Sequence, residues 1–314
     1  QVLTSGHLDQ KNQPFQDLCT IFKYAWNQVS INQIYANNNP LYPNKMPDDA
    51  NPVAITNSDL VGYKKRMQKN FQGQLTLEYD IPGIDGLKAK GMYNYGYNAD
   101  DNTDHKRTYN LYTYNAEQNT YGASLVGAPA FINRAFANSV SSLSQLSLNY
   151  AKMFNDSHNV SALLLLEESH FKSDNFYAQR NVSIPIDYLF GGEDTQQLGS
   201  MHVNGLREEA TRSYIGRLNY DYKGKYLAEF SFRKDGSNKF KPGAEQWGFF
   251  PAGSVGWRIS EESFFKNLVS PDLVSNLKLR ASYGQTGDDG ATAFQYISGF
   301  NYPTLNPNDN SVWG

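Results

Sequence analysis

The sequence lacks the features that mark several large classes of protein. Cys19 is the only cysteine among 314 residues, which excludes an internal disulfide and a cysteine-rich metal site. No run of 18 apolar residues occurs, so the sequence offers no transmembrane helix. With a formal net charge of −3 and only 19% charged residues, the chain also lacks the basic surface expected of a nucleic-acid-binding protein.

Motifs of catalysis and cofactor binding are missing as well. The segment GSVG at 253–256 does not have the G-x-S-x-G pattern of a hydrolase, and neither a P-loop nor a dinucleotide-binding glycine motif occurs. We therefore expect no enzymatic activity and no cofactor. Clustered carboxylates suit Ca²⁺, so Asp100, Asp101 and Asp104 are a weak candidate calcium site. That segment lacks the glycine and distal glutamate of an EF-hand loop, and a solvated polar loop is the simpler interpretation.

Aromatic residues are abundant instead, with 22 Tyr and 18 Phe, and this composition favours strands joined by polar loops. From Phe71 onward, apolar and polar residues alternate with the period of two that is typical of strands. The alternation predicts eight strands, at 71–79, 87–97, 146–150, 160–166, 214–222, 226–232, 255–259 and 277–283. In the strand at 226–232, Tyr226, Ala228, Phe230 and Phe232 form an apolar face, and Glu229, Ser231 and the following Arg233 form a polar face.

The connections between these strands alternate between short and long, which is typical of an up-and-down antiparallel meander. This alternation leaves no place for Arg107–Asn115 as a spanning strand, so we expect that segment to be one arm of a hairpin inside a long loop. Residues 1–70 are poorly periodic and predict a loop region, with a short amphipathic helix at Asp17–Val29.

The apolar face has the layout of a membrane barrel. Aromatic residues lie near both ends of the strands, as expected at the two interfaces of a bilayer, and leucines lie between them. The aromatic residues are Tyr79, Tyr150, Tyr220, Tyr222, Tyr226 and Trp257 at the short-turn ends, and Tyr93, Tyr95 and Tyr97 at a long-loop end. Strands in a bilayer must close into a barrel, so the polar face predicts a lumen. A soluble β-sandwich or solenoid also alternates and is the alternative.

Several motifs carry a family resemblance. NPVAI (51–55), FQGQLTLEYDIPGIDGLKAKGMYNY (71–95), RSYIGRLNYDYKGKYLAEFSFRKDGSNKF (212–240), QWGFFPAGSVGWRISEESFFK (246–266) and LKLRASYGQTGDDG (277–290) follow one another in order. Over residues 50–290 the chain resembles the barrel of the SusC/RagA family of TonB-dependent outer-membrane transporters. The resemblance implies an all-β antiparallel barrel of about 22 strands with an N-terminal plug, in the outer membrane of a Gram-negative bacterium.

The resemblance also implies function and partners. It implies TonB-powered uptake of oligosaccharides, or of peptides in some members, under an extracellular SusD-like lipoprotein lid. Partners would be that lipoprotein, the TonB complex, the oligosaccharide and outer-membrane lipid. The plug and the C-terminal strands have no counterpart here, so we expect a barrel fragment with a loop region at 1–70, barrel strands and loops at 71–290, and the next extracellular loop or strand at 291–314.

Candidate substrate-binding residues follow from this interpretation, because aromatic rings stack on sugar faces and planar polar groups bond hydroxyls. In the loops these are Tyr112, Tyr114, Tyr121, Arg134, Tyr188 and Trp247, and on the polar face Arg217, Arg233 and Arg258. Each has a structural alternative: packing within loops, contact with the lid, or pairing with other charges. Two functional alternatives stay open, a soluble or surface carbohydrate-binding β-protein and TonB-dependent uptake of a siderophore or haem.

Overall fold

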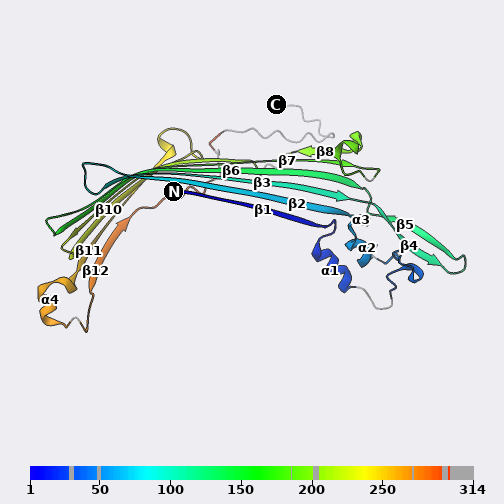
Figure 1. Cartoon of the computed structure of the whole chain (residues 1–314), viewed down its shortest axis with the longest axis horizontal. Coiled ribbons are helices and arrows are strands. Elements are labelled where there is room, and N and C mark those ends of the chain that lie inside the picture. The colour runs from blue at the N-terminus through cyan, green and yellow to red at the C-terminus, as the bar shows by residue number, and fades with distance from the viewer. Residues whose placement is uncertain are drawn as a thin grey trace, which may run out of the picture. The chain divides into compact units, whose positions relative to one another are not determined.

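The computed structural model describes residues 1–27, 32–47, 51–184, 186–200, 205–270, 272–291 and 296–297. Within these residues the main feature is a ten-stranded sheet with the order β1-β2-β3-β6-β7-β9-β10-β11-β12, with β8 paired to β7 (Figure 1). Its strands are β1 (Val2–Pro14), β2 (Gly62–Asp80), β3 (Leu87–Lys106), β6 (Phe131–Phe154), β7 (His158–Asn181), β8 (Gln197–Ser200), β9 (Arg207–Tyr222), β10 (Tyr226–Ser237), β11 (Trp247–Arg258) and β12 (Lys278–Gly284).

The order of the strands confirms the predicted meander. All eight predicted strands are present, as β2, β3, β6, β7, β9, β10, β11 and β12, and each lies beside its neighbour in the chain within the main sheet. The hairpin predicted around Arg107–Asn115 is also present. β4 (Tyr109–Asn115) pairs with β5 (Thr120–Val126) in a separate two-stranded sheet between β3 and β6.

Two features of the sheet were not predicted. β1 pairs antiparallel with β2 over its whole length, from Val2 opposite Leu75 to Pro14 opposite Tyr63, although its sequence shows no clean alternation. Several strands also run well past their periodic segments: β3 continues from Tyr97 to Lys106, so Asp100, Asp101 and Asp104 lie in a strand and not in the predicted loop. The long connections are correspondingly shorter than the sequence indicates.

The helices are short. α1 (Leu18–Trp26) confirms the predicted helix at Asp17–Val29 as far as Asn27, beyond which residues 28–31 are outside the described part. Asp17 caps it by accepting a hydrogen bond from the Thr20 amide at 2.8 Å. α2 (Pro52–Thr56), α3 (Ser58–Val61) and α4 (Ser263–Leu268) complete the α-helices of the described residues. No helix in the described ranges is long and apolar enough to cross a membrane. Most of the predicted segment 291–314 lies outside these ranges.

The chain divides into two compact units. Unit 1 comprises Gln1–Thr76, Tyr93–Leu143 and His170–Glu208, and unit 2 comprises Leu77–Met92, Ser144–Ser169 and Glu209–Gly314. Unit 1 contains most of the buried apolar side chains, among them Ile55, Val61, Leu111 and Ile132. The fully buried Asn51 connects its short segments, because its amide donates to the carbonyl oxygens of Ile34 and Asn44 while its side-chain oxygen caps α2.

Unit 2 has one apolar and one polar sheet face. On β10, Phe230 lies opposite Leu218 of β9, and Tyr226 lies opposite Tyr222 of β9 and Trp257 of β11, which forms an aromatic row at the short-turn end. The leucines of the apolar face are exposed, with Leu146 at 63% and Leu279 at 62%. A water-soluble sheet would bury this face against another layer. The alternation predicted for β10 is therefore present, while the direction of each face relative to a lumen stays a prediction.

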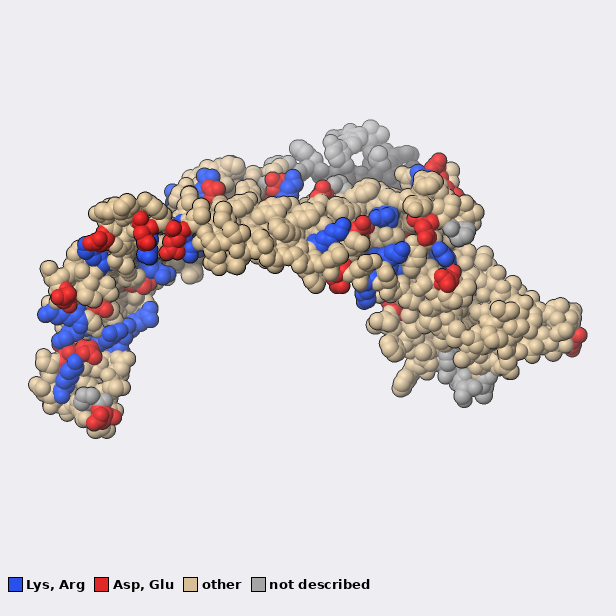
Figure 2. Space-filling model, in the orientation of Figure 1, with Lys and Arg blue, Asp and Glu red and all other residues tan. Residues whose placement is uncertain are grey.

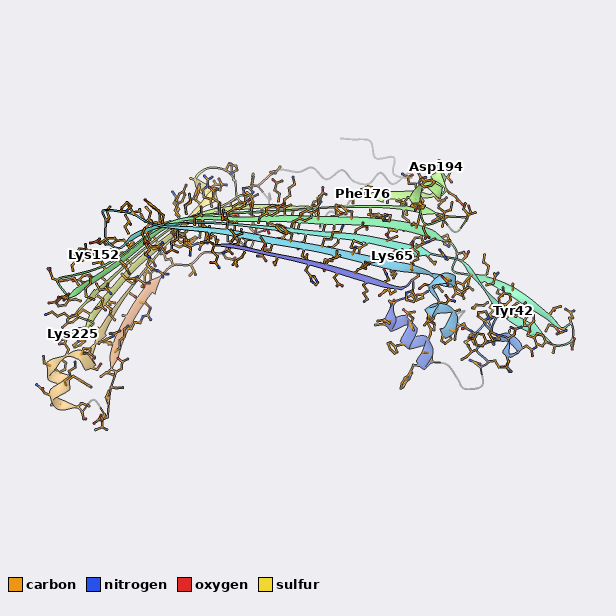
Figure 3. All side chains as sticks on the ribbon, in the orientation of Figure 1. Tyr42, Lys65, Lys152, Phe176, Asp194 and Lys225 are labelled. Atoms are coloured by element: carbon orange, nitrogen blue, oxygen red, sulfur yellow. The ribbon has the colours of Figure 1, made fainter. Side chains whose placement is uncertain are left out.

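The short-turn end of unit 2 is held by Glu262, which follows β11. Its Oε1 accepts from the Tyr226 hydroxyl at 2.7 Å and from Trp257 Nε1 at 3.2 Å, and its Oε2 accepts from Lys225 Nζ at 3.1 Å. The bond from Tyr226, followed by those from Lys225 and Trp257, lowers the pKa of Glu262 to about 2. Figure 2 shows basic and acidic residues mixed over the α4 end of this unit, and Figure 3 labels Lys152 and Lys225 at the same end of the strands.

Glu262→Gln is expected to make the stability of the fold less dependent on pH between pH 7 and 2. The folded-state pKa of Glu262 lies below the ordinary value of 4.5, so its ionised form stabilises the fold fully above about pH 5, and that contribution is lost as pH falls through the folded-state pKa of about 2. The unfolding midpoint of the full-length protein, followed from pH 7 to 2, should therefore fall less in Glu262→Gln. Glu261→Gln is the matched control, because the exposed Glu261–Lys266 pair contributes little. Equal pH profiles for natural protein and Glu262→Gln would refute this role.

Candidate functional site

A cavity of about 510 Å³ lies at the long-connection end of unit 2. Its floor is the polar face of β9 and β10, where the strand register brings Asp235 opposite Ser213 and Ser237 opposite Thr211. Its rim comes from the β10–β11 connection, which contributes Glu245 and Gln246, and from the segment 287–289 after β12. Hydroxyl, amide, carboxylate and guanidinium groups therefore converge on one concave surface, which is the usual composition of a polar ligand site.

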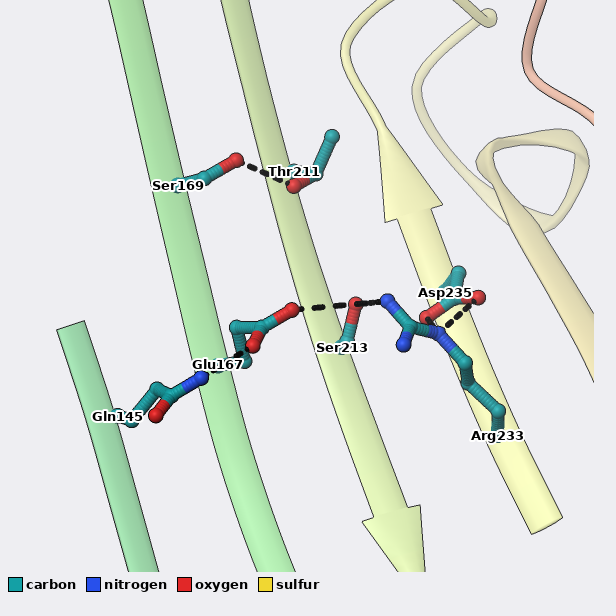
Figure 4. A network of polar contacts seen from close by, with 7 residues as sticks. All are labelled: Gln145, Glu167, Ser169, Thr211, Ser213, Arg233 and Asp235. Carbon is teal, nitrogen blue, oxygen red and sulfur yellow. Dashed lines mark hydrogen bonds and ion pairs between the residues drawn. The ribbon is translucent and has the colours of Figure 1, made fainter. Parts of the chain in front are cut away.

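Arg233 is the centre of the polar network in this cavity (Figure 4). Its Nε donates to both carboxylate oxygens of Asp235 at 2.7 Å, and its Nη2 donates to Ser213 Oγ at 3.1 Å and lies 3.6 Å from Glu167 Oε1. Glu167 Oε2 accepts from the Gln145 amide at 2.6 Å. The guanidinium is thus fixed by two carboxylates from β7 and β10 before any ligand arrives.

The segment 287–289 reaches the cavity because of a close approach to β11. A side chain on Gly287 would overlap the ring of Phe250, so a larger residue here would require that ring to shift. Lys239 fixes the same segment, donating to the Asp289 carbonyl oxygen at 3.1 Å and pairing with its carboxylate at 3.7 Å. Asp288 and Asp289 are therefore held at the rim of the cavity.

Trp247 contributes to the rim, but most of its ring lies on the apolar side of the sheet. It packs over Gly236, with the Tyr214 ring at 5.8 Å and the Lys234 ammonium 5.3 Å from its centroid. This placement resembles the loop-end aromatic belt of a membrane strand more than a free stacking platform. Of the nine predicted substrate-binding residues, Arg233 and Trp247 line this cavity.

Three predicted aromatic residues meet in unit 1. Tyr121 of β5 stacks on Tyr42 at a centroid distance of 4.0 Å, Tyr112 of β4 meets Tyr42 edge-on at 4.9 Å, and Tyr114 lies 5.1 Å from Tyr121. Tyr42 was not predicted, because nothing in the segment before it shows that it folds against the hairpin. It does so through backbone bonds, from the Tyr112 amide to the Pro43 carbonyl and from the Lys45 amide to the Tyr112 carbonyl, both at 2.8 Å. These rings pack mainly on one another.

Other predicted residues lie apart. In unit 1, Arg134 pairs with Asp101 at 2.8 Å, and the exposed Tyr188 stacks on Phe190. In unit 2, Arg217 lies opposite Ser231 in the β9–β10 register, and Arg258 lies opposite Lys278 at the short-turn end. No acidic side chain of the described residues lies within ion-pair distance of either arginine.

The candidate calcium site gains no support. Asp101 is paired with Arg134, and Asp104 with Arg66. Asp100 and Asp101 are neighbours in a strand, so their side chains point to opposite faces of the sheet. Within the part of the chain that the structure describes, no group of three metal-ligating side chains is present.

Comparison with protein-family models finds no match. Among curated proteins, the chain is 36% identical over 167 residues to TonB-dependent receptor P39 of Formosa agariphila, covering 50% of this chain and 15% of the receptor. It is 28% identical to receptor P3 of the same organism, over 82% of this chain and 24% of that receptor. It is 36% identical to TonB-dependent receptor SusC of Bacteroides thetaiotaomicron, over 37% of this chain and 14% of SusC.

Solved structures show the same fold. The RagAB peptide importer in its closed-closed state matches with a TM-score of 0.56 at 18% identity, over 74% of this chain and 23% of that one, and the open-open state matches equally well. The chain is similar to a part of the SusC/RagA-type TonB-dependent receptors, and its fold matches part of RagAB. It spans between 14% and 24% of the length of these curated relatives. Such receptors are transporters and not enzymes.

The similarity to TonB-dependent receptors suggests what surrounds the sheet. A TonB-dependent receptor lies in the outer membrane of a Gram-negative bacterium, and we propose that the exposed leucine face of unit 2 is the face that meets lipid. The comparisons favour this interpretation over the alternative of a soluble carbohydrate-binding β-protein. On that proposal, the polar face, which carries the cavity, is turned away from lipid.

Proposed function

We propose that the full-length receptor containing this chain imports oligosaccharides across the outer membrane, powered through TonB and assisted by a SusD-like lipoprotein lid. The cavity around Arg233 carries this proposal, because it offers hydroxyl, amide and carboxylate groups for a ligand rich in hydroxyls. The kinship to SusC supports import, and the fold likeness to RagAB supports an assembly of barrel and lid.

The part of the cargo that meets this cavity would bond to Gln246, Ser213 and the remaining donors of Arg233, with Trp247 at the rim. Tyr112, Tyr114, Tyr121, Arg134, Tyr188, Arg217 and Arg258 lie outside the cavity, so a role for them in binding requires other surfaces of the full-length receptor. No covalent step is needed, since transport requires binding and release alone.

Peptide import is a second candidate. The fold likeness is to a structure described as a peptide importer, and the cavity's carboxylates would also bind the amino groups of a peptide. At 18% identity, the likeness does not extend to the cargo.

The test compares cargoes and cavity variants of the full-length receptor. Binding of an oligosaccharide panel and a peptide panel is measured by calorimetry, and uptake is measured in cells. Gln246→Ala is expected to weaken binding of the imported cargo by up to about tenfold, the value of one lost hydrogen bond. Gln118→Ala, on the exposed β4–β5 turn, is the matched control and should leave binding unchanged. Uptake of an iron chelate, with no oligosaccharide or peptide bound, would overturn the proposal in favour of siderophore or haem transport.

A further inference from the structure

Acidic side chains outnumber basic ones in the lining of the cavity around Arg233. Its lining contains four carboxylates, from Asp235, Glu245, Asp288 and Asp289, against the single guanidinium of Arg233. We infer that this cavity admits neutral or positively charged cargo and excludes anionic cargo, such as sulfated or uronic-acid oligosaccharides. The inference rests on the proposed import function and adds the charge class of the cargo.

The basic side chains in and beside the cavity are already paired with carboxylates of the protein. Arg233 gives its Nε to both oxygens of Asp235, and its Nη2 lies between Ser213 and Glu167. Lys239 beside the rim is bonded to Asp289. An incoming anion would have to take Arg233 from its partners, which would leave the carboxylates of Asp235 and Glu167 without a counter-charge.

The negative charges are only partly compensated. Asp235 and Asp289 have the basic partners just described, whereas Glu245 has no basic partner within ion-pair distance among the described residues. Asp288 accepts only the amide of Gly290, at 3.0 Å, within the same part of the chain. Both residues line the rim of the cavity. A concave surface of one sign concentrates ligands of the opposite sign and repels those of its own.

Thiol modification measures this charge preference without knowledge of the cargo. In the full-length receptor with its native cysteines replaced, Gln246→Cys places a thiol in the cavity and Thr113→Cys places one on the exposed face of β4. Each is treated with a cationic and an anionic methanethiosulfonate of similar size. For each thiol, the rate of modification by the cationic reagent is divided by the rate for the anionic reagent. This ratio should be about tenfold higher at Gln246→Cys than at Thr113→Cys. Adding Glu245→Gln and Asp288→Asn should abolish that excess. Equal ratios at the two thiols would overturn the inference.

A second arm uses three hexasaccharides of matched length: N-acetylglucosamine (neutral), glucosamine (cationic) and galacturonic acid (anionic). The receptor is expected to bind the neutral or cationic hexamer at least about tenfold more tightly than the anionic one. Glu245→Lys should narrow this gap, whereas Asp272→Lys, on an exposed connection outside the cavity, should not. Preferred binding of the anionic hexamer would refute the inference and leave oligosaccharide import standing. Binding of none of the three, with uptake of peptide or iron chelate, would refute the proposed function, while the thiol rates would still report the charge preference.

Discussion

Gly86→Ala is expected to destabilise the receptor by about 3 kcal/mol or more, because the substitution combines backbone strain with a backbone clash. Gly86 ends the short turn between β2 and β3 with a φ of +83°, a conformation that L side chains rarely adopt. A Cβ there would overlap the carbonyl oxygen of Ala151, and the Ala151 amide donates to the Gly86 carbonyl at 2.9 Å. The turn cannot move away without breaking its contact with β6.

Gly83 in the same turn provides the matched control. Its φ of +86° is nearly the same, but a Cβ there would meet no atom within 4 Å. Gly83→Ala therefore carries only the conformational cost, about 1 kcal/mol. Both variants are compared by denaturant unfolding of the full-length receptor in phospholipid vesicles, followed by tryptophan fluorescence. Similar midpoints for the two would show that the contact between the turn and β6 contributes nothing to stability.

The strands of unit 2 were predictable because one of their faces is apolar along the strand, as a surface in contact with lipid would require. Alternation in β10 and β11 follows directly from that requirement, and Tyr226 beside Trp257 has the position expected of residues at a membrane interface. Beyond the bilayer both faces of a strand meet polar surroundings, so the alternation stops while the hydrogen-bonded ladder continues. This explains why the continuation of β3 to Lys106 was missed. β1 was missed because its own sequence shows no clean alternation, although Val2 lies opposite Leu75 of β2.

The cavity was predictable only in part, because three distant segments build it. The sequence singled out Arg233 and Trp247, but DGSNKF at 235–240 suggested only a structural turn, and Asp235 in fact holds Arg233 in place. The sequence did not indicate that Glu245 and Asp288 line the same cavity. Their proximity depends on the order of β10, β11 and β12 and on the close approach of Gly287 to Phe250. Tyr42 was missed for the same reason, since its partners Tyr112 and Tyr121 lie on a hairpin far along the chain.

Leu146→Arg is expected to destabilise the receptor by about 2–4 kcal/mol, the range for a cation placed on the lipid face of an outer-membrane barrel. Leu146 lies on β6 with 63% of its surface exposed. In water an exposed leucine accepts arginine with almost no change in stability, within about 0.5 kcal/mol. The size of the change in unfolding free energy therefore distinguishes a face in contact with lipid from a face in contact with water. It is measured as the change in unfolding free energy of the full-length receptor in vesicles.

Ser147→Arg is the control, because residues next to each other on a strand face opposite sides. The Asn149 amide donates to Ser147 Oγ at 3.1 Å, and Gln145 two residues earlier bonds to Glu167, so these three lie on the polar face with the cavity network. A cation at 147 stays in water and near Glu167, and should change the unfolding free energy by less than about 1 kcal/mol. If Ser147→Arg were the costlier change, the two faces would have to be exchanged, and the cavity around Arg233 would then face lipid.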